Sequence, residues 1–132
     1  MRLNKTTLYV FLFGLLILLS ACSGDNHSPT WQTITATDAR SIMNETENFV
    51  ILDVRTLAEF LEIRIDGAIL IPFDEILDSA NTKLTDKNTT IFVYCRTGRR
   101  SALAASDLVT LGFTAIYDFG GIVDWLYETI SG

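Results

Sequence analysis

The sequence predicts an α/β domain built on a parallel β-sheet that helices cover. Short apolar, β-branched runs alternate with amphipathic stretches from about Thr33 onward, which is typical of parallel strands joined by helices. The runs "FVILDV" and "TIFVY" are almost continuously apolar, as expected of central strands buried on both faces. With 132 residues and no internal repeat or linker, we expect one compact domain.

The elements follow one another in a regular order. We expect strands at residues 33–34, 49–54, 68–71, 90–94 and 115–117. Four helices are expected before the end of the chain. The first covers 37–43, and the second begins at a capping box formed by Thr56 and Glu59. The third covers 73–78 after Pro72, and the fourth covers 99–111 and ends before Gly112. The segment "GGIVDWLYETI" predicts a last helix after a glycine pair.

The first 21 residues have the composition of a secretory signal peptide. Arg2 and Lys5 give a positive start, an apolar run of about a dozen residues follows at 8–19, and small residues come next. Such a run is short for crossing a bilayer. We therefore expect cleavage before Cys22, a polar tether at 22–32 and the folded domain at 33–132.

The sequence Leu19-Ser20-Ala21-Cys22 resembles the lipobox of bacterial lipoproteins. This resemblance implies diacylglycerol on Cys22 and a fatty acid such as palmitate on the new amino terminus, which together would hold the protein stably on a membrane. The expected location is the outer face of the plasma membrane, or the outer membrane on the periplasmic side. The alternatives are an ordinary secreted protein in which Cys22 has no role, and an uncleaved anchor.

The charge of the chain limits its partners. Ten Lys and Arg residues stand against sixteen Asp and Glu residues, and the loss of Arg2 and Lys5 with the signal peptide leaves the mature protein still more acidic. Such a balance argues against nucleic acid as a partner.

Cys95 is the main candidate for chemistry. If Cys22 carries lipid, Cys95 is the only remaining thiol, so an intrachain disulfide is excluded. Cys95 follows the predicted strand "TIFVY" and precedes the longest predicted helix, and sites in open α/β sheets form at such carboxyl ends. A strand–loop–helix corner also aims backbone N–H groups at whatever occupies the loop.

The segment "CRTGRRS" surrounds this thiol with positive charge and backbone donors, which favour the reactive thiolate and attract an anionic substrate. Gly98 permits a tight turn, and Ser101 can cap the following helix or donate its hydroxyl into the site. The alternative is a polar loop beside a buried structural cysteine. The expected substrate-binding residues are Arg96, Thr97, Gly98, Arg99, Arg100 and Ser101.

The single histidine, His27, lies in the tether. A Cys–His pair, a serine triad and most zinc sites therefore have no histidine in the domain. We expect neither a metal nor an organic cofactor.

Four segments in this order, "ILDVRTLAEF", "GAILIP", "IFVYCRTGRRSALAASDLVTLGF" and "IYDFGGIVDW", resemble a single-domain rhodanese, a sulfurtransferase. The resemblance implies a five-stranded parallel sheet with helices on both faces, a Cys95 persulfide and substrate held in the loop from Cys95 to Arg100. It also implies transfer of a sulfane sulfur from a small anionic donor such as thiosulfate to cyanide, a thiol or another protein.

Two alternatives remain. Phosphatases and arsenate reductases share this fold but have a loop one residue longer, whereas Arg100 lies only five positions after Cys95. The shorter loop favours a sulfur atom over a tetrahedral oxyanion. A membrane-tethered persulfide carrier or redox-sensing binding module with little turnover would need the same reactive thiolate.

The segment "EFLEIRIDGA" departs from the family pattern, because Ile63 and Arg64 replace the usual glycine and histidine. We expect altered local packing and altered substrate access there. In "DVR", Asp53 and Arg55 are expected to form a structural pair at a strand end that supports neighbouring loops.

Overall fold

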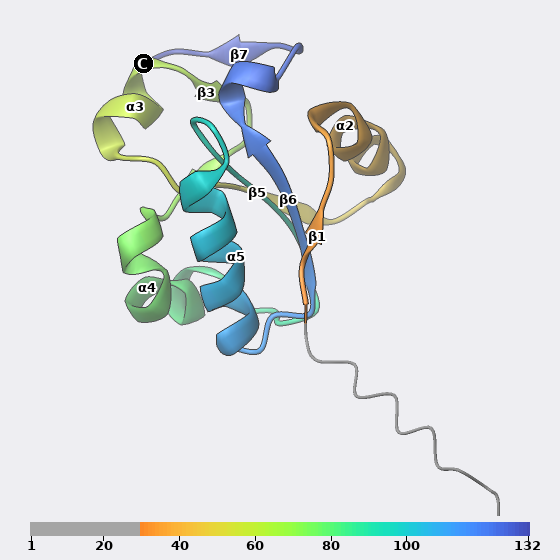
Figure 1. Cartoon of the computed structure of the whole chain (residues 1–132), viewed down its shortest axis with the longest axis vertical. Coiled ribbons are helices and arrows are strands. Elements are labelled where there is room, and N and C mark those ends of the chain that lie inside the picture. Colours follow the sequence, from red (N-terminus) through yellow and green to blue (C-terminus); the bar gives the residue numbers. More distant parts are fainter. Residues whose placement is uncertain (1–29) are drawn as a thin grey trace, which may run out of the picture.

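The computed structural model describes residues 30–132, so the expected signal peptide, Cys22 and His27 lie outside the described residues. Its main sheet has the strand order β1-β6-β5-β2-β4, and every neighbouring pair is parallel (Figure 1). This confirms the five-stranded parallel sheet. The strands are β1 (Gln32–Thr33), β2 (Phe49–Asp53), β4 (Ile69–Leu70), β5 (Thr90–Cys95) and β6 (Ala115–Gly121).

Helices cover both faces of this sheet. In Figure 1, α2 lies on one side of the sheet and α4 and α5 lie on the other. Among residues 30–132, none of the helices has the length and apolar character needed to cross a membrane. The helices are α2 (Ala36–Glu45), α3 (Leu57–Glu62), α4 (Ile76–Lys83) and α5 (Arg99–Thr110), with short 3-10 turns η1 (Phe73–Glu75) and η2 (Ile122–Asp124).

Local sequence signals explain where the helices begin and end. The Thr56 side chain accepts the Glu59 N–H while the Glu59 carboxylate accepts the Thr56 N–H, which confirms the expected capping box on α3. Thr35 caps α2 by accepting the Asp38 N–H at 3.0 Å. Gly112 follows α5 with φ of 89°, a conformation that favours glycine.

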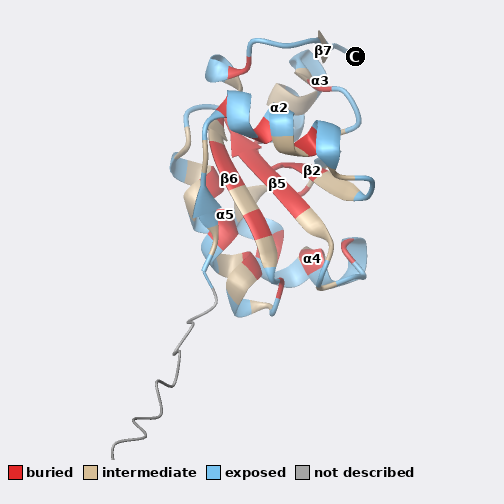
Figure 2. Cartoon of the chain, turned by 90° about the vertical axis from the view of Figure 1, so that its right-hand side faces the viewer, coloured by how far each residue is buried: buried red, intermediate tan, exposed pale blue. Residues whose placement is uncertain are grey.

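Strand β5 divides its side chains between the two faces of the sheet, as a period of two requires. Val93 and Cys95 belong to the core under α4 and α5, whereas Phe92 and Tyr94 belong to the core under α2. Figure 2 shows β5 as continuously buried over most of its length, whereas β6 alternates between buried and partly buried residues. Cys95 therefore lies at the carboxyl end of a buried central strand, on the α5 face.

The prediction of a carboxyl-terminal helix is wrong. Gly120 and Gly121 end β6, η2 lasts three residues, and β7 (Thr129–Ile130) pairs antiparallel with β3 (Arg64–Ile65). Gly120 has φ of 83° and belongs to β6, so the glycine pair ends a strand; the 3-10 turn after it stops at Asp124, because Trp125 takes extended backbone with φ of −80° and ψ of 113°. The Trp125 indole packs on Phe119 and donates to the Glu128 carbonyl, so it anchors the segment without a helix.

Candidate active site at the carboxyl end of β5

The loop after β5 wraps its backbone around the Cys95 sulfur. The Gly98 N–H donates to Cys95 Sγ at 3.0 Å, and Gly98 takes φ of 110°, which glycine adopts without strain. No side chain caps α5, whose first residue is Arg99. The sulfur therefore occupies the place of a capping group at the positive end of a twelve-residue helix.

The environment of Cys95 favours its ionised form. Burial of the side chain, which is 1% exposed, raises the pKa of the thiol. Hydrogen bonds from the Ser101 and Gly98 N–H groups, the Ser101 hydroxyl and the Thr97 N–H lower the pKa by more, so it lies below its ordinary value of 9.0. The thiol is as buried as a structural cysteine would be, yet amide donors converge on it as an activated thiolate requires.

Ser101 lies inside the first turn of α5. It therefore does not cap the helix, which was one of the two roles that the sequence predicted for it. Its hydroxyl lies 3.0 Å from the Gly98 carbonyl and 3.4 Å from the Gly120 carbonyl, and it also lowers the pKa of Cys95. A hydroxyl has one proton to donate. Ser101 can therefore direct that proton to the thiolate when the sulfur is charged.

The end of β6 supports the loop by close backbone contact. After a register shift in β5, Cys95 pairs with Gly121. A Cβ on Gly121 would lie only 2.7 Å from the carbonyl carbon of Arg96 and from the Thr97 Cα, so only glycine fits there. The Val123 N–H donates to the Arg96 carbonyl at 3.4 Å, which gives a second backbone contact between the loop and the segment after β6.

The arginines of the loop differ in their surroundings. The Arg100 guanidinium donates to both Glu59 oxygens, at 2.8 and 2.7 Å, so its charge is largely compensated. The hydrogen bond with Glu59 is the largest cause that raises the pKa of Arg100, and the charge of the Cys95 thiolate also raises it. Arg96 and Arg99 are exposed, and within residues 30–132 neither has an ion-pair partner.

Asp53 and Arg55 form the structural pair that the sequence predicted. The Arg55 guanidinium donates to Asp53 Oδ1 and Oδ2 at 2.7 to 3.1 Å, and both side chains are buried. Arg55 also donates to the Ile63 carbonyl at 2.6 Å. Burial lowers the pKa of Arg55, but the hydrogen bond and charge of Asp53 raise it by more. The pair therefore links the end of β2 to the segment after α3.

The two residues that depart from the family pattern have different environments. Arg64 donates to the Phe60 and Gly132 carbonyls and its guanidinium lies 4.7 Å from the centre of the Phe60 ring, so it packs β3, α3 and the end of the chain together. Ile63 is 40% exposed and lines a pocket beside the cysteine loop. The pocket measures about 290 Å³, and its lining is Arg55, Glu59, Glu62, Ile63, Arg96, Ile122 and Val123.

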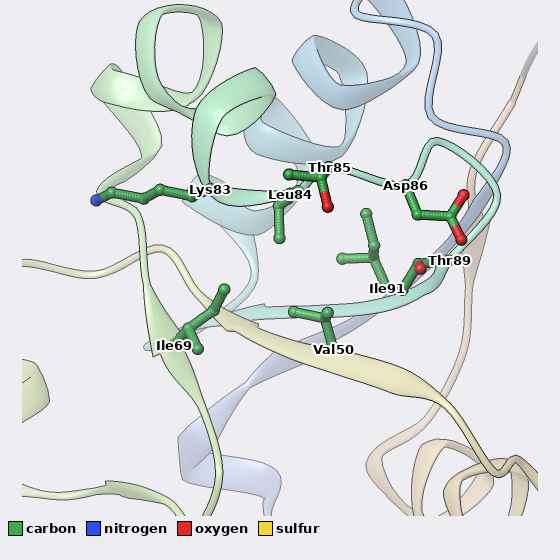
Figure 3. Close-up of a pocket in the computed structure, with 8 residues that line it drawn as sticks. All are labelled: Val50, Ile69, Lys83, Leu84, Thr85, Asp86, Thr89 and Ile91. Atoms are coloured by element: carbon green, nitrogen blue, oxygen red, sulfur yellow. The ribbon is translucent and has the colours of Figure 1, made fainter.

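Another pocket, of about 160 Å³, lies far from the loop. Figure 3 shows Val50, Leu84 and Ile91 facing into it, while Lys83 extends away. Ile91 precedes Cys95 by four residues on β5, about 13 Å at the rise of an extended strand. This pocket therefore takes no part in the chemistry of the thiol.

Three residues that contribute to the site have roles that the sequence did not predict. Glu59 was expected only as a capping residue, and Gly120 and Gly121 were expected only to precede a helix. The capping box does signal a well-placed Glu59 carboxylate, but its contact with Arg100 joins elements 41 residues apart. The glycine pair "GG" indicates in the sequence that another part of the backbone comes close to it. The sequence does not show that this part is the backbone of Arg96 and Thr97.

The fold and the site together define a parallel α/β domain with one buried thiol held by a short loop of backbone amides at the start of a helix. The chain belongs to the rhodanese-like domain family, whose model matches residues 35–128. Membership agrees with the resemblance in the sequence and with the five-stranded sheet.

Relatives with assigned names are similar across most of the domain. Thiosulfate sulfurtransferase PspE of Escherichia coli is 35% identical over 81 residues, which cover 61% of this chain and 78% of that protein. The putative sulfur carrier protein YrkF of Bacillus subtilis is 34% identical, over 63% of this chain and 44% of that protein. The probable adenylyltransferase/sulfurtransferase MoeZ of Mycobacterium tuberculosis is 35% identical, and the match spans only 24% of its length.

Solved structures are similar in fold. A rhodanese with anions from E. coli is 34% identical with a TM-score of 0.59, and the match covers 63% of this chain and 98% of that one. A rhodanese-like domain protein from Staphylococcus aureus is 31% identical with a TM-score of 0.66, covering 76% and 98%. Family and relatives support sulfur transfer as the general activity of this domain.

Proposed function

We propose that the protein is a thiosulfate sulfurtransferase that works through a persulfide on Cys95. The Cys95 thiolate attacks the outer sulfur of thiosulfate, the S–S bond of the donor breaks, and sulfite leaves with the electron pair. The product, Cys95-S-S⁻, keeps the charge that the thiolate had. An acceptor, which is cyanide in an assay and a thiol or a protein in the cell, then attacks the outer sulfur and restores the thiolate.

The observation that carries this proposal is the Gly98 N–H that donates to Cys95 Sγ at 3.0 Å from a loop that leads directly into α5. The N–H groups of Thr97, Gly98 and Ser101 lower the pKa of the thiol, so they stabilise negative charge on sulfur. The same donors suit a persulfide anion, because its charge extends only one atom beyond Sγ. The exposure of Arg96 and Arg99 in the loop supports a role for both in attracting the anionic donor.

The test is turnover of the domain with thiosulfate and cyanide, followed as thiocyanate. Cys95→Ser should abolish turnover, whereas Ser106→Ala, an exposed change on the same helix, should leave it intact. Mass spectrometry of the thiosulfate-treated protein should find one added sulfur on Cys95. Thiocyanate formation that survives in Cys95→Ser would remove this cysteine from the mechanism.

A persulfide carrier or redox sensor with little turnover is a second candidate, because it needs the same activated thiolate. One relative, YrkF, is named a putative sulfur carrier protein. The two candidates differ in stoichiometry. Many thiocyanate molecules per protein support the enzyme, while a single sulfur added and released without further turnover supports the carrier.

We also propose that lipid on Cys22 anchors the domain to the exported face of a membrane. The motif Leu19-Ser20-Ala21-Cys22 supports this. The full chain should incorporate labelled palmitate and should sediment with membranes. The Cys22→Ser variant should do neither. Equal labelling of Cys22→Ser would exclude this anchor.

A further inference from the structure

The pocket beside the cysteine loop is larger than an inorganic donor needs. Its volume of about 290 Å³ corresponds to roughly ten water molecules at ~30 Å³ each. It approaches the size of ordinary small-molecule sites. Its wall includes Arg96, the residue after Cys95, and Glu59, which holds Arg100. A molecule in this pocket would therefore border the loop that surrounds the sulfur.

One side of the pocket is apolar and open to solvent. Ile63 is 40% exposed and Val123 is 59% exposed, and Ile122, which also lines the pocket, packs against the fold's core. These three side chains come from segments about sixty residues apart in sequence that meet at the pocket. Exposed aliphatic side chains that gather around a cavity, rather than scatter singly, are typical of a surface that binds an apolar group.

Some of the charged side chains that line the pocket have ion-pair partners and others do not. Arg55 is held by Asp53 and Glu59 is held by Arg100, so neither is available to a ligand. Within residues 30–132, neither Arg96 nor Glu62 has an ion-pair partner; Arg96 directly follows Cys95, whereas Glu62 ends α3. The pocket thus offers a free cation on the residue that follows Cys95, together with exposed hydrocarbon from Ile63 and Val123. This arrangement fits an anionic head with an attached carbon chain.

We propose that the pocket binds the organic part of a sulfane-sulfur donor, with Ile63 and Val123 as specificity-determining residues that favour such a donor over inorganic thiosulfate. The inference rests on the proposed sulfur transfer through Cys95. With an organic thiosulfonate, the Cys95 thiolate attacks the outer sulfur and the bond between the two sulfurs breaks. The sulfinate leaves with the electron pair, and Cys95-S-S⁻ forms. Arg96 binds the sulfonyl oxygens while the carbon chain lies against Ile63 and Val123.

The experiment compares methanethiosulfonate, propanethiosulfonate and thiosulfate as donors, with cyanide as the common acceptor and thiocyanate as the product. Burial of one methylene is worth about a fourfold gain, so two methylenes should raise kcat/KM about 15-fold from the methane to the propane compound. Ile63→Ala and Val123→Ala should each reduce that ratio severalfold, because the chain loses its apolar contacts. Leu77→Ala is the matched control, since Leu77 is 52% exposed on α4, outside the pocket.

A second readout needs no turnover. Propanesulfonate, which carries no sulfane sulfur, should slow alkylation of Cys95 in the wild type and in Leu77→Ala, but much less in Ile63→Ala. Equal kcat/KM for the two thiosulfonates, or an unchanged ratio in both pocket variants, would overturn the specificity inference while leaving sulfur transfer intact. The absence of thiocyanate with every donor, together with protection by propanesulfonate, would instead remove the proposed function and keep the pocket.

Discussion

The Glu59 carboxylate holds the Arg100 guanidinium through two charge-assisted hydrogen bonds, 2.7 and 2.8 Å long, and so ties α3 to the cysteine loop. The same carboxylate accepts the Thr56 N–H and hydroxyl at 3.0 and 2.9 Å. One side chain therefore completes a helix cap and fixes the last arginine of the loop. Because Arg100 is held in this way, Arg96 and Arg99 are the loop cations left for an anionic donor.

Glu59→Gln should lower the stability of the domain in a pH-dependent way. The hydrogen bond from Arg100 is the largest cause that lowers the pKa of Glu59, from 4.5 to about 2, against a smaller opposing effect of burial. A lowered folded-state pKa stabilises the fold above the unfolded value of 4.5, and the contribution is lost as the pH falls toward 2. For this partly exposed pair we expect a loss of about 1–2 kcal/mol at neutral pH.

Urea unfolding of the wild type and Glu59→Gln between pH 7 and pH 2 measures this difference. The gap between the two should be constant above about pH 5 and should shrink toward pH 2. Glu47→Gln is the control, because Glu47 is exposed and, within residues 30–132, has no ion-pair partner. A gap that stays constant down to pH 2 would contradict the assignment.

Ser101→Ala should raise the pH at which Cys95 ionises. Burial raises the pKa of Cys95, and donors that include the Ser101 N–H and hydroxyl lower it by more. Removing the hydroxyl leaves fewer donors, so the pKa should move up toward its ordinary value. Titration of the ultraviolet absorbance of the thiolate measures this without a reagent that must reach the buried sulfur. Ser106→Ala should titrate like the wild type, and a midpoint unchanged in Ser101→Ala would exclude the hydroxyl from the stabilisation.

The sheet could be predicted from the sequence because its signals are local. Apolar strands such as "TIFVY" and the Thr56–Glu59 cap encode their conformations within a few residues, and both are present. The end of the chain could not be predicted in this way. The apolar residues after Gly121 fit a helix as well as a turn, and antiparallel pairing of β7 with β3 decides between them across more than sixty residues.

For the site, the sequence predicted the position of Cys95 and of the amide-rich loop, because a strand followed by glycine and a helix determines that geometry. It did not predict which arginine would be neutralised. That outcome depends on the direction of α3, which brings Glu59 to Arg100. Substrate binding by Arg96 and Arg99 stays a prediction.

Asp53→Asn should destabilise the domain strongly. It would leave the Arg55 guanidinium buried without a carboxylate, and breaking one side of a buried pair costs about 3–5 kcal/mol. Urea unfolding measures the loss. Asp118→Asn is the matched control: Asp118 is equally buried but accepts only the neutral Gly120 N–H, which an amide oxygen can also accept. A loss in Asp53→Asn no larger than in Asp118→Asn would exclude a special role for the pair.

Gly121→Ala should impair sulfur transfer far more than it impairs folding. Its φ of −118° suits any residue, so the damage comes from the added Cβ, which would meet the backbone of Arg96 and Thr97. The loop must shift, and a displacement near 1 Å at a reacting centre costs about 100-fold in rate. Thiocyanate assays measure the loss, and circular dichroism checks that the fold remains. Gly112→Ala is the matched control, because it strains the backbone without a clash. Gly112 has φ of 89°, and a Cβ there would lie in open space. This variant should cost about 1 kcal/mol of stability with little loss of turnover, so equal turnover in the two variants would show that β6 does not position the loop.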